Sequence, residues 1–164
     1  MQHFSKLNYF QVYKHLDRVS GVVVEQNLAV SFSHDKTVRV WDMDKHEKIW
    51  EFVHGNKVYA AIVRDSQVIT SCLDKIVRVL ALENGEELHR LDHPDECRCI
   101  DLSPNKSLLA VACSSAVVLW DMNKLIKIKQ FDLGSGINDL RFNPSADTLI
   151  VGLREGEIYK IEMK

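Results

Sequence analysis

The sequence lacks a long hydrophobic run. Its longest apolar stretch, Leu108–Trp120, is interrupted by Ser114 and Ser115, and it is shorter than the roughly 20 residues that a helix needs to cross a bilayer. The first ten residues, MQHFSKLNYF, do not combine a basic start with an apolar core. We therefore expect neither a membrane span nor a secretory signal.

The sequence also lacks an excess of charge of either sign. The 21 Lys and Arg residues and the 23 Asp and Glu residues leave a net charge of −2. Surfaces that bind nucleic acid or anionic membranes are normally basic, so we expect no membrane partner and regard nucleic acid as a disfavoured one. With 46% hydrophobic residues among 164, the chain can bury the core of a single globular domain.

Cysteine is scarce, and its four positions do not form a metal-binding pattern. Cys72, Cys97, Cys99 and Cys113 all fall inside expected strands. Cys97 and Cys99 are two residues apart, so strand alternation predicts that they share one face of a sheet. A zinc site would need two close pairs on turns. We expect reduced core cysteines, no metal, no cofactor and an intracellular protein, cytoplasmic or nuclear.

Helical periodicity is almost absent, and a segment of about ten residues recurs along the chain. Ser33–Asp42, SHDKTVRVWD, returns as LDKIVRVLAL at 73–82, as SSAVVLWDMN at 114–123 and as EGEIYKIEMK at 155–164. A period near 40 residues, with short alternating apolar runs between turn residues, predicts repeated units of four antiparallel strands.

The repeat divides the chain into four units after an N-terminal tail at 1–7. We place repeat 1 at 19–55, repeat 2 at 56–94, repeat 3 at 95–134 and repeat 4 at 135–164. The fourth unit lacks its outer strand, and 8–16 precedes repeat 1 as the other outer strands precede their repeats. We expect 8–16 to complete the fourth unit, because an open edge strand invites pairing with other chains.

The repeated polar residues identify a family. A Trp-Asp pair closes the third strand of two units, an Asp precedes that strand in two, and a His stands four residues ahead of the inner strand in three. These positions are Trp41-Asp42, Trp120-Asp121, Asp35, Asp74, His15, His54 and His93. The pattern resembles the WD-repeat family. The resemblance covers about residues 8–164 and implies an all-β fold, a β-propeller of four-stranded antiparallel blades with about four repeats.

The units depart from the family pattern to different degrees. Leu80 replaces the tryptophan of the second unit, and Leu133 and Glu155 stand where the fourth would have its histidine and aspartate. The third unit has a shortened turn at Ser114-Ser115 that lacks the aspartate. Only the first unit keeps every position.

The resemblance implies that the repeated polar side chains form a buried structural hydrogen-bond set. A His, a Ser and an Asp in one domain would also suit a hydrolase triad, but the second unit repeats part of the set, which a unique catalytic site would not do. We expect no enzymatic activity. The residues of the expected set are His15, Ser31, Asp35, Trp41, His54, Thr70, Asp74, His93 and Trp120.

The resemblance also implies that partners dock on the turns at one end of the ring, where loops lie on a rigid scaffold. Tyr59 and Arg98 are of the residue types favoured as binding anchors; alternatively, both pack against neighbouring blades. The residues expected to bind a partner are Arg18, Asn56, Lys57, Tyr59, Glu96, Arg98 and Asn138.

The function that we expect is a scaffold or adaptor for protein–protein interaction, which presents partners within a larger assembly. A ubiquitin-ligase substrate receptor is one example. The alternative is a propeller subunit of RNA processing or ribosome assembly.

Four blades are few for this family. The chain closes alone into a small ring, pairs with a second copy, or forms part of a longer protein. In the last case its first and last blades would expose apolar faces, and such faces predict association.

Overall fold

The computed structural model of the chain describes residues 14–163. This part of the chain forms fifteen β-strands and no helix, so it contains no helix that is long and apolar enough to cross a membrane. The strands form four antiparallel sheets, in which each strand pairs with its neighbour in the sequence. The all-β architecture predicted from the alternating pattern is confirmed.

Each sheet is one blade, and its strands run in order from the inner to the outer side. Blade 1 consists of β1 (Val19–Glu25), β2 (Leu28–Ser33), β3 (Thr37–Asp42) and β4 (Glu47–Val53). Blade 2 consists of β5 (Val58–Arg64), β6 (Gln67–Cys72), β7 (Ile76–Ala81) and β8 (Glu87–Asp92). Blade 3 consists of β9 (Cys97–Leu102), β10 (Leu108–Cys113), β11 (Ala116–Asp121) and β12 (Ile126–Asp132). Blade 4 has three strands, β13 (Ile137–Phe142), β14 (Thr148–Leu153) and β15 (Ile158–Glu162).

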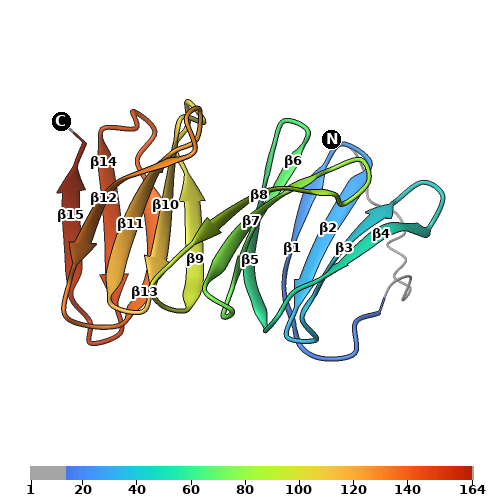
Figure 1. The fold of residues 1–164 in the computed structure, drawn as a ribbon, viewed down its shortest axis with the longest axis horizontal. Coiled ribbons are helices and arrows are strands. Elements are labelled where there is room, and N and C mark those ends of the chain that lie inside the picture. Colours follow the sequence, from blue (N-terminus) through green and yellow to red (C-terminus); the bar gives the residue numbers. More distant parts are fainter. Residues whose placement is uncertain (1–13, 164) are drawn as a thin grey trace, which may run out of the picture.

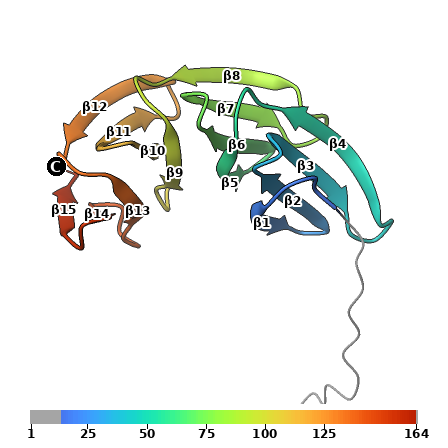
Figure 2. The ribbon, with the colours of Figure 1, turned by 90° about the horizontal axis from the view of Figure 1, so that it is seen from below.

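The four blades stand side by side along an arc (Figures 1 and 2). Figure 2 shows β1, β5, β9 and β13 on the concave side and β4, β8 and β12 on the convex side. Neighbouring inner strands contact one another, β1 with β5, β5 with β9 and β9 with β13. Blades 1 and 4 occupy the two ends of the arc, so each has one face with no neighbouring blade among the described residues.

The turn before β3 has a local cause in the sequence. The carboxylate of Asp35 accepts the backbone N–H of Thr37 at 3.0 Å, and Lys36 between them takes a left-handed conformation with φ of 72°. Blade 2 repeats this turn with Asp74, which accepts the N–H of Ile76 at 3.2 Å. An aspartate that hydrogen-bonds the backbone two residues later stabilises such a turn.

Each inner strand contains an irregularity directly after its first residue. In blade 3 the register shifts so that Cys97 pairs with Cys113 and Cys99 with Ala112. A β-bulge of one residue reverses the faces that follow it. Cys97 therefore packs in the core between blades 2 and 3, while Cys99 packs against the core between blades 3 and 4. The prediction that these two cysteines share a face was wrong, because simple alternation ignores the bulge.

The hydrophobic cores lie between the blades. One core joins blades 1 and 2 through residues such as Val38 and Val68, and equivalent cores join blades 2 to 3 and 3 to 4. At the ends of the arc, in contrast, Val22, Val24 and Ile158 are 57%, 58% and 75% exposed.

The expected N-terminal strand at 8–16 lies mostly outside the described residues. Lys14, His15 and Leu16, which are described, form no strand.

Candidate functional site

The predicted site residues are divided between strands and the turns that precede β1, β3, β5, β7 and β9. Backbone hydrogen bonds tie these turns together within each blade. His54 N–H donates to Lys36 O at 2.8 Å in blade 1, and His93 N–H donates to Lys75 O at 2.9 Å in blade 2. The end of one outer strand is thus fixed to the turn that precedes β3 or β7, which gives the surface loops a rigid base.

Blade 1 brings four polar side chains into one chain of hydrogen bonds. The indole N–H of Trp41 donates to Ser31 Oγ at 2.8 Å, and Ser31 Oγ lies 2.7 Å from Nε2 of His15. Nδ1 of His15 lies 2.9 Å from Oδ2 of Asp35. With the proton of His15 on Nδ1, every member of the set has a partner, as buried polar groups require.

Several donors hold the Asp35 carboxylate in its charged form. Burial alone would raise its pKa, but hydrogen bonds from Thr37, the Leu16 backbone and His15 lower the pKa well below its ordinary value. Arg39 also lies 3.5 Å from Oδ2. Asp35 is thus an ionised acceptor surrounded by donors, and Ser31, at the other side of His15, is buried and also accepts the Trp41 indole N–H.

Blade 2 retains only half of this arrangement. Thr70 Oγ1 lies 2.9 Å from Nε2 of His54, but Nδ1 of His54 is buried and, among the described residues, has no hydrogen-bond partner. Asp74 instead lies 2.8 Å from a guanidinium nitrogen of Arg78. Burial, and then the charge of Arg78, lower the pKa of His54 to about 4. Of the expected members in blade 2, His54 and Thr70 are therefore hydrogen-bonded to each other, whereas Asp74 pairs with Arg78 and not with His54.

Blade 3 has a shorter link that the sequence reasoning missed. Val111 occupies the position of Ser31 and Thr70, so the Trp120 indole N–H donates directly to Nε2 of His93 at 3.0 Å. Nδ1 of His93 donates to the carbonyl of Leu91 at 2.9 Å. Burial lowers the pKa of His93 to about 4. The absence of a hydroxyl at Val111 was the sequence signal for this rearrangement.

Tyr59 and Arg98 meet on the rim of the concave surface. The Arg98 guanidinium lies 4.8 Å from the centroid of the Tyr59 ring, and His34 stacks on Tyr59 with ring centroids 4.9 Å apart. Glu96 pairs with Arg98 at 3.1 Å. These four residues, the rim stack, come from three blades and remain partly exposed. His34 was not selected from the sequence, because its neighbour Asp35 accounted for the turn.

The other predicted binding residues lie at the starts of inner strands, on the turns before β1 and β5 or, for Asn138, in β13. Arg18, Lys57 and Asn138 are exposed, and the half-buried Asn56 accepts the N–H of Lys57 with its side chain. Below the rim, the four inner strands line a cavity of about 340 Å³.

We expect Ser31→Ala to lower the free energy of unfolding more than Thr70→Val. Removing the Ser31 hydroxyl removes two buried hydrogen bonds, the one from the Trp41 indole N–H and the one with Nε2 of His15, at a cost of about 1–3 kcal/mol for each. Among residues 14–163 the Thr70 hydroxyl has only His54 as hydrogen-bond partner, because blade 2 has Leu80 in place of tryptophan. Urea unfolding followed by fluorescence measures both; equal losses would mean that the hydrogen bonds of blade 1 do not act as a set.

We expect stability to fall as the pH decreases from about 6.5 to about 4. The unfolded chain binds protons at the ordinary histidine pKa of 6.5, whereas folded His54 and His93 remain neutral until about 4. Each contributes up to about 1.4 kcal/mol per pH unit across that window. His93→Gln should make the pH profile of unfolding shallower, and the exposed control His89→Gln should not. Parallel profiles for all three proteins would contradict the assignment.

Comparison with known proteins adds to this geometry. Residues 9–42 and 85–121 match the family model described as WD domain, G-beta repeat. The chain is 22% identical over 153 residues to the serine-threonine kinase receptor-associated protein of Gallus gallus, covering 92% of this chain and 44% of that protein. It is 30% identical over 116 residues to the small ribosomal subunit protein RACK1 of Drosophila melanogaster, covering 66% of this chain and 36% of that protein.

A solved structure shares the fold. The WD40 β-propeller domain of Doa1 superimposes with a TM-score of 0.84 at 21% identity, covering 93% of this chain and 53% of that chain. The present chain thus spans less than half the length of the two curated relatives. Its matched repeats, its recurring Trp-Asp and histidine positions and its four-stranded blades lead to one conclusion: the chain contains WD repeats and has the fold of a WD40-type β-propeller.

Proposed function

We propose that this chain is a non-catalytic scaffold for protein–protein interaction, an adaptor that holds a protein partner within a larger intracellular assembly, in the cytoplasm or the nucleus. The observation that carries the proposal is the rim stack of His34, Tyr59, Arg98 and Glu96. It places an aromatic ring and a guanidinium, partly exposed, on a rigid surface shared by three blades.

The chemistry of the rim stack suits a binding anchor. Tyrosine and arginine are enriched among the residues that dominate binding energy at interfaces. Stacking by His34 and Arg98 restricts the Tyr59 ring before a partner arrives, so less conformational entropy is lost on binding. Arg18, Asn56, Lys57 and Asn138 lie around it and would form the polar rim of the interface.

The relatives support the same class of function. One of them is named as a receptor-associated protein and another as a ribosomal subunit protein. Presenting a substrate to a ubiquitin ligase would be one form of this adaptor role. The ribosomal relative also favours the alternative, a subunit of RNA processing or ribosome assembly. Affinity capture from lysate with and without nuclease separates the two, because an RNA-dependent partner is lost after digestion.

Tyr59→Ala and Arg98→Ala should each weaken capture of the same partner by about thirtyfold or more, since loss of an anchor typically costs about 2 kcal/mol or more. Their thermal midpoints should stay near that of the unmodified chain, because both side chains are partly exposed. Tyr159→Ala and Arg90→Ala, which change exposed residues on β15 and β8, are the controls. Unchanged capture by the rim variants, or equal loss with the controls, would place the interface elsewhere.

We also propose that further blades cover the two ends of the arc, supplied by a longer polypeptide or by a second copy. Ile150 and Ile158 of blade 4 are 40% and 75% exposed, whereas their counterparts in blade 3, Ala110 and Val117, are completely buried by the next blade. The faces at the two ends of the arc are therefore equivalent to blade faces that the next blade covers elsewhere in the chain.

The isolated chain should associate in solution through these faces. Light scattering is expected to give a mass above that of the monomer, and the double substitution Val22→Lys with Val24→Lys should reduce that mass. Ile126→Lys, at a residue 51% exposed on the outer strand β12, is the matched control. A monodisperse monomer with a cooperative melt would show that four blades suffice.

A further inference from the structure

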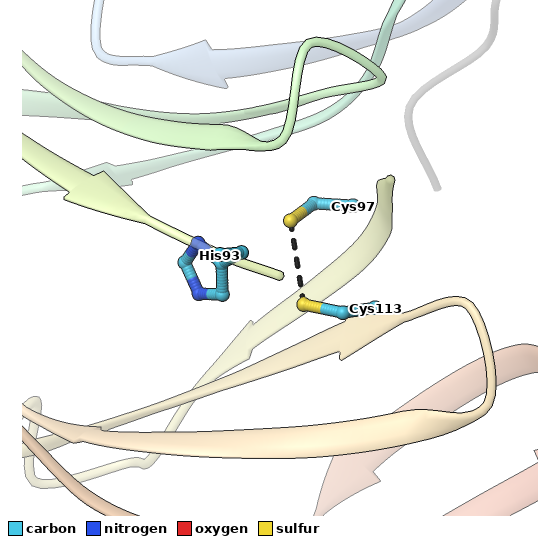
Figure 3. Close-up of side chains that lie close together, drawn as sticks. All are labelled: His93, Cys97 and Cys113. Atoms are coloured by element: carbon cyan, nitrogen blue, oxygen red, sulfur yellow. Dashed lines mark hydrogen bonds between the residues drawn. The ribbon is translucent and has the colours of Figure 1, made fainter. Parts of the chain in front are cut away.

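Two thiols meet at the junction of blades 2 and 3. Cys97 is the first residue of β9 and Cys113 the last of β10, and the two are paired across the strands. Their sulfur atoms lie 3.3 Å apart (Figure 3), and the residues are 0% and 1% exposed. The contact is a hydrogen bond between thiols. The two cysteines are directly opposite each other on adjacent strands, as the cysteines of a cross-strand disulfide are.

The repeat itself shows that the fold does not require cysteine at these positions. In every blade the first residue of the inner strand pairs with the last residue of the next strand. The four pairs are Val19 with Ser33, Val58 with Cys72, Cys97 with Cys113, and Ile137 with Leu153. Blade 3 alone among the four has a thiol at both positions, whereas blades 1 and 4 have apolar or hydroxyl side chains there and blade 2 has a valine and a single thiol.

His93 lies beside this pair, and its ligand atom and the two sulfurs are within 4.8 Å of one another (Figure 3). Both of its nitrogens are already used, however, by the Trp120 indole and the Leu91 carbonyl. A metal ion would have to break one of these bonds and would then have three protein ligands, one fewer than a structural zinc site normally has. The contact between the two thiols, in contrast, requires no hydrogen bond of His93 to be broken.

The pair lies at the end of the blade, under a single turn. The exposed Ser114 follows Cys113 in a left-handed conformation with φ of 52°, and its N–H donates to Glu96 O at 3.1 Å. The hydrogen bond with Cys113, and then burial, raise the pKa of the Cys97 thiol far above its ordinary value. The closed state is therefore unreactive, and reaction proceeds when the strand ends open locally, which costs less than global unfolding.

We propose that Cys97 and Cys113 are a site of oxidative modification, at which a hydroperoxide forms an intrachain disulfide between β9 and β10. The thiolate of one cysteine attacks the peroxide O–O bond, becomes a sulfenic acid and, with hydrogen peroxide, releases water. The second thiol then attacks the sulfenic sulfur, forms the S–S bond and releases another water. Two thiols and one hydrogen peroxide give one disulfide and two waters, and a dithiol reductant reverses the modification.

The test treats the reduced, folded chain with hydrogen peroxide, unfolds it and alkylates the remaining thiols. We expect the four thiols of the chain to fall to two. Cleavage by trypsin after Arg98 separates Cys97 from Cys99, so the expected product is a disulfide-linked pair of the peptides 91–98 and 107–124, identified by mass spectrometry and lost on reduction.

The repeat supplies matched variants that should fold. Cys97→Val introduces the residue of blades 1 and 2, and Cys113→Ser introduces the residue of blade 1. Both should abolish the linked peptides while the melting temperature of the reduced protein stays near that of the parent. Cys99→Ser removes the one partly exposed thiol, which could link two chains, and should leave the product unchanged.

Two results would overturn the proposal. In the first, both thiols remain alkylatable after peroxide has oxidised the half-buried Met43, which would make them inert core residues. In the second, added Co²⁺ gives a thiolate-to-metal charge-transfer absorption that Cys97→Val removes and that protects the pair from peroxide. That result would make the cluster with His93 a metal site instead.

Discussion

The structure depends on the apolar layer between neighbouring blades. A four-stranded sheet has two faces, and a single blade cannot bury both, so each blade is stable only against its neighbours. Val38 and Val40 of blade 1 meet Val68 and Leu80 of blade 2 in one such layer, and the pattern repeats at the next two junctions. The arc and its concave surface follow from this stacking.

Polar side chains stabilise the turns at one end of the blades. In blade 1 the hydrogen-bond set of Trp41, Ser31, His15 and Asp35 links the segment before β1 to the turn before β3. The set has fewer members in the following blades. It consists of a histidine and a threonine in blade 2 and of a direct Trp120–His93 hydrogen bond in blade 3. Backbone hydrogen bonds between the same turns persist in all four blades, which explains how blade 4 keeps its shape without any member of the set.

The same stacking creates the surfaces on which the proposals rest. Because inner strands from successive blades stand side by side, residues about 40 positions apart in the sequence become neighbours. Tyr59 of blade 2 thereby lies between His34 of blade 1 and Arg98 of blade 3. Because of the bulge in β9, Cys97 lies against Cys113 at the junction with blade 2, whereas Cys99 faces the junction with blade 4.

The sequence by itself determined the strands, the repeat and the turn chemistry. These depend on local rules: side chains alternate along a strand, aspartates at 35 and 74 close a turn, and a 39-residue spacing returns His15, His54 and His93 to equivalent places. Only the tertiary structure decided which side chains meet. A one-residue bulge has no compositional signature, yet it reverses the faces that follow it. The loss of one hydroxyl at Val111 let Trp120 reach His93, and the stacking of blades brought Tyr59 to Arg98, because such contacts depend on distances between strands far apart in the chain.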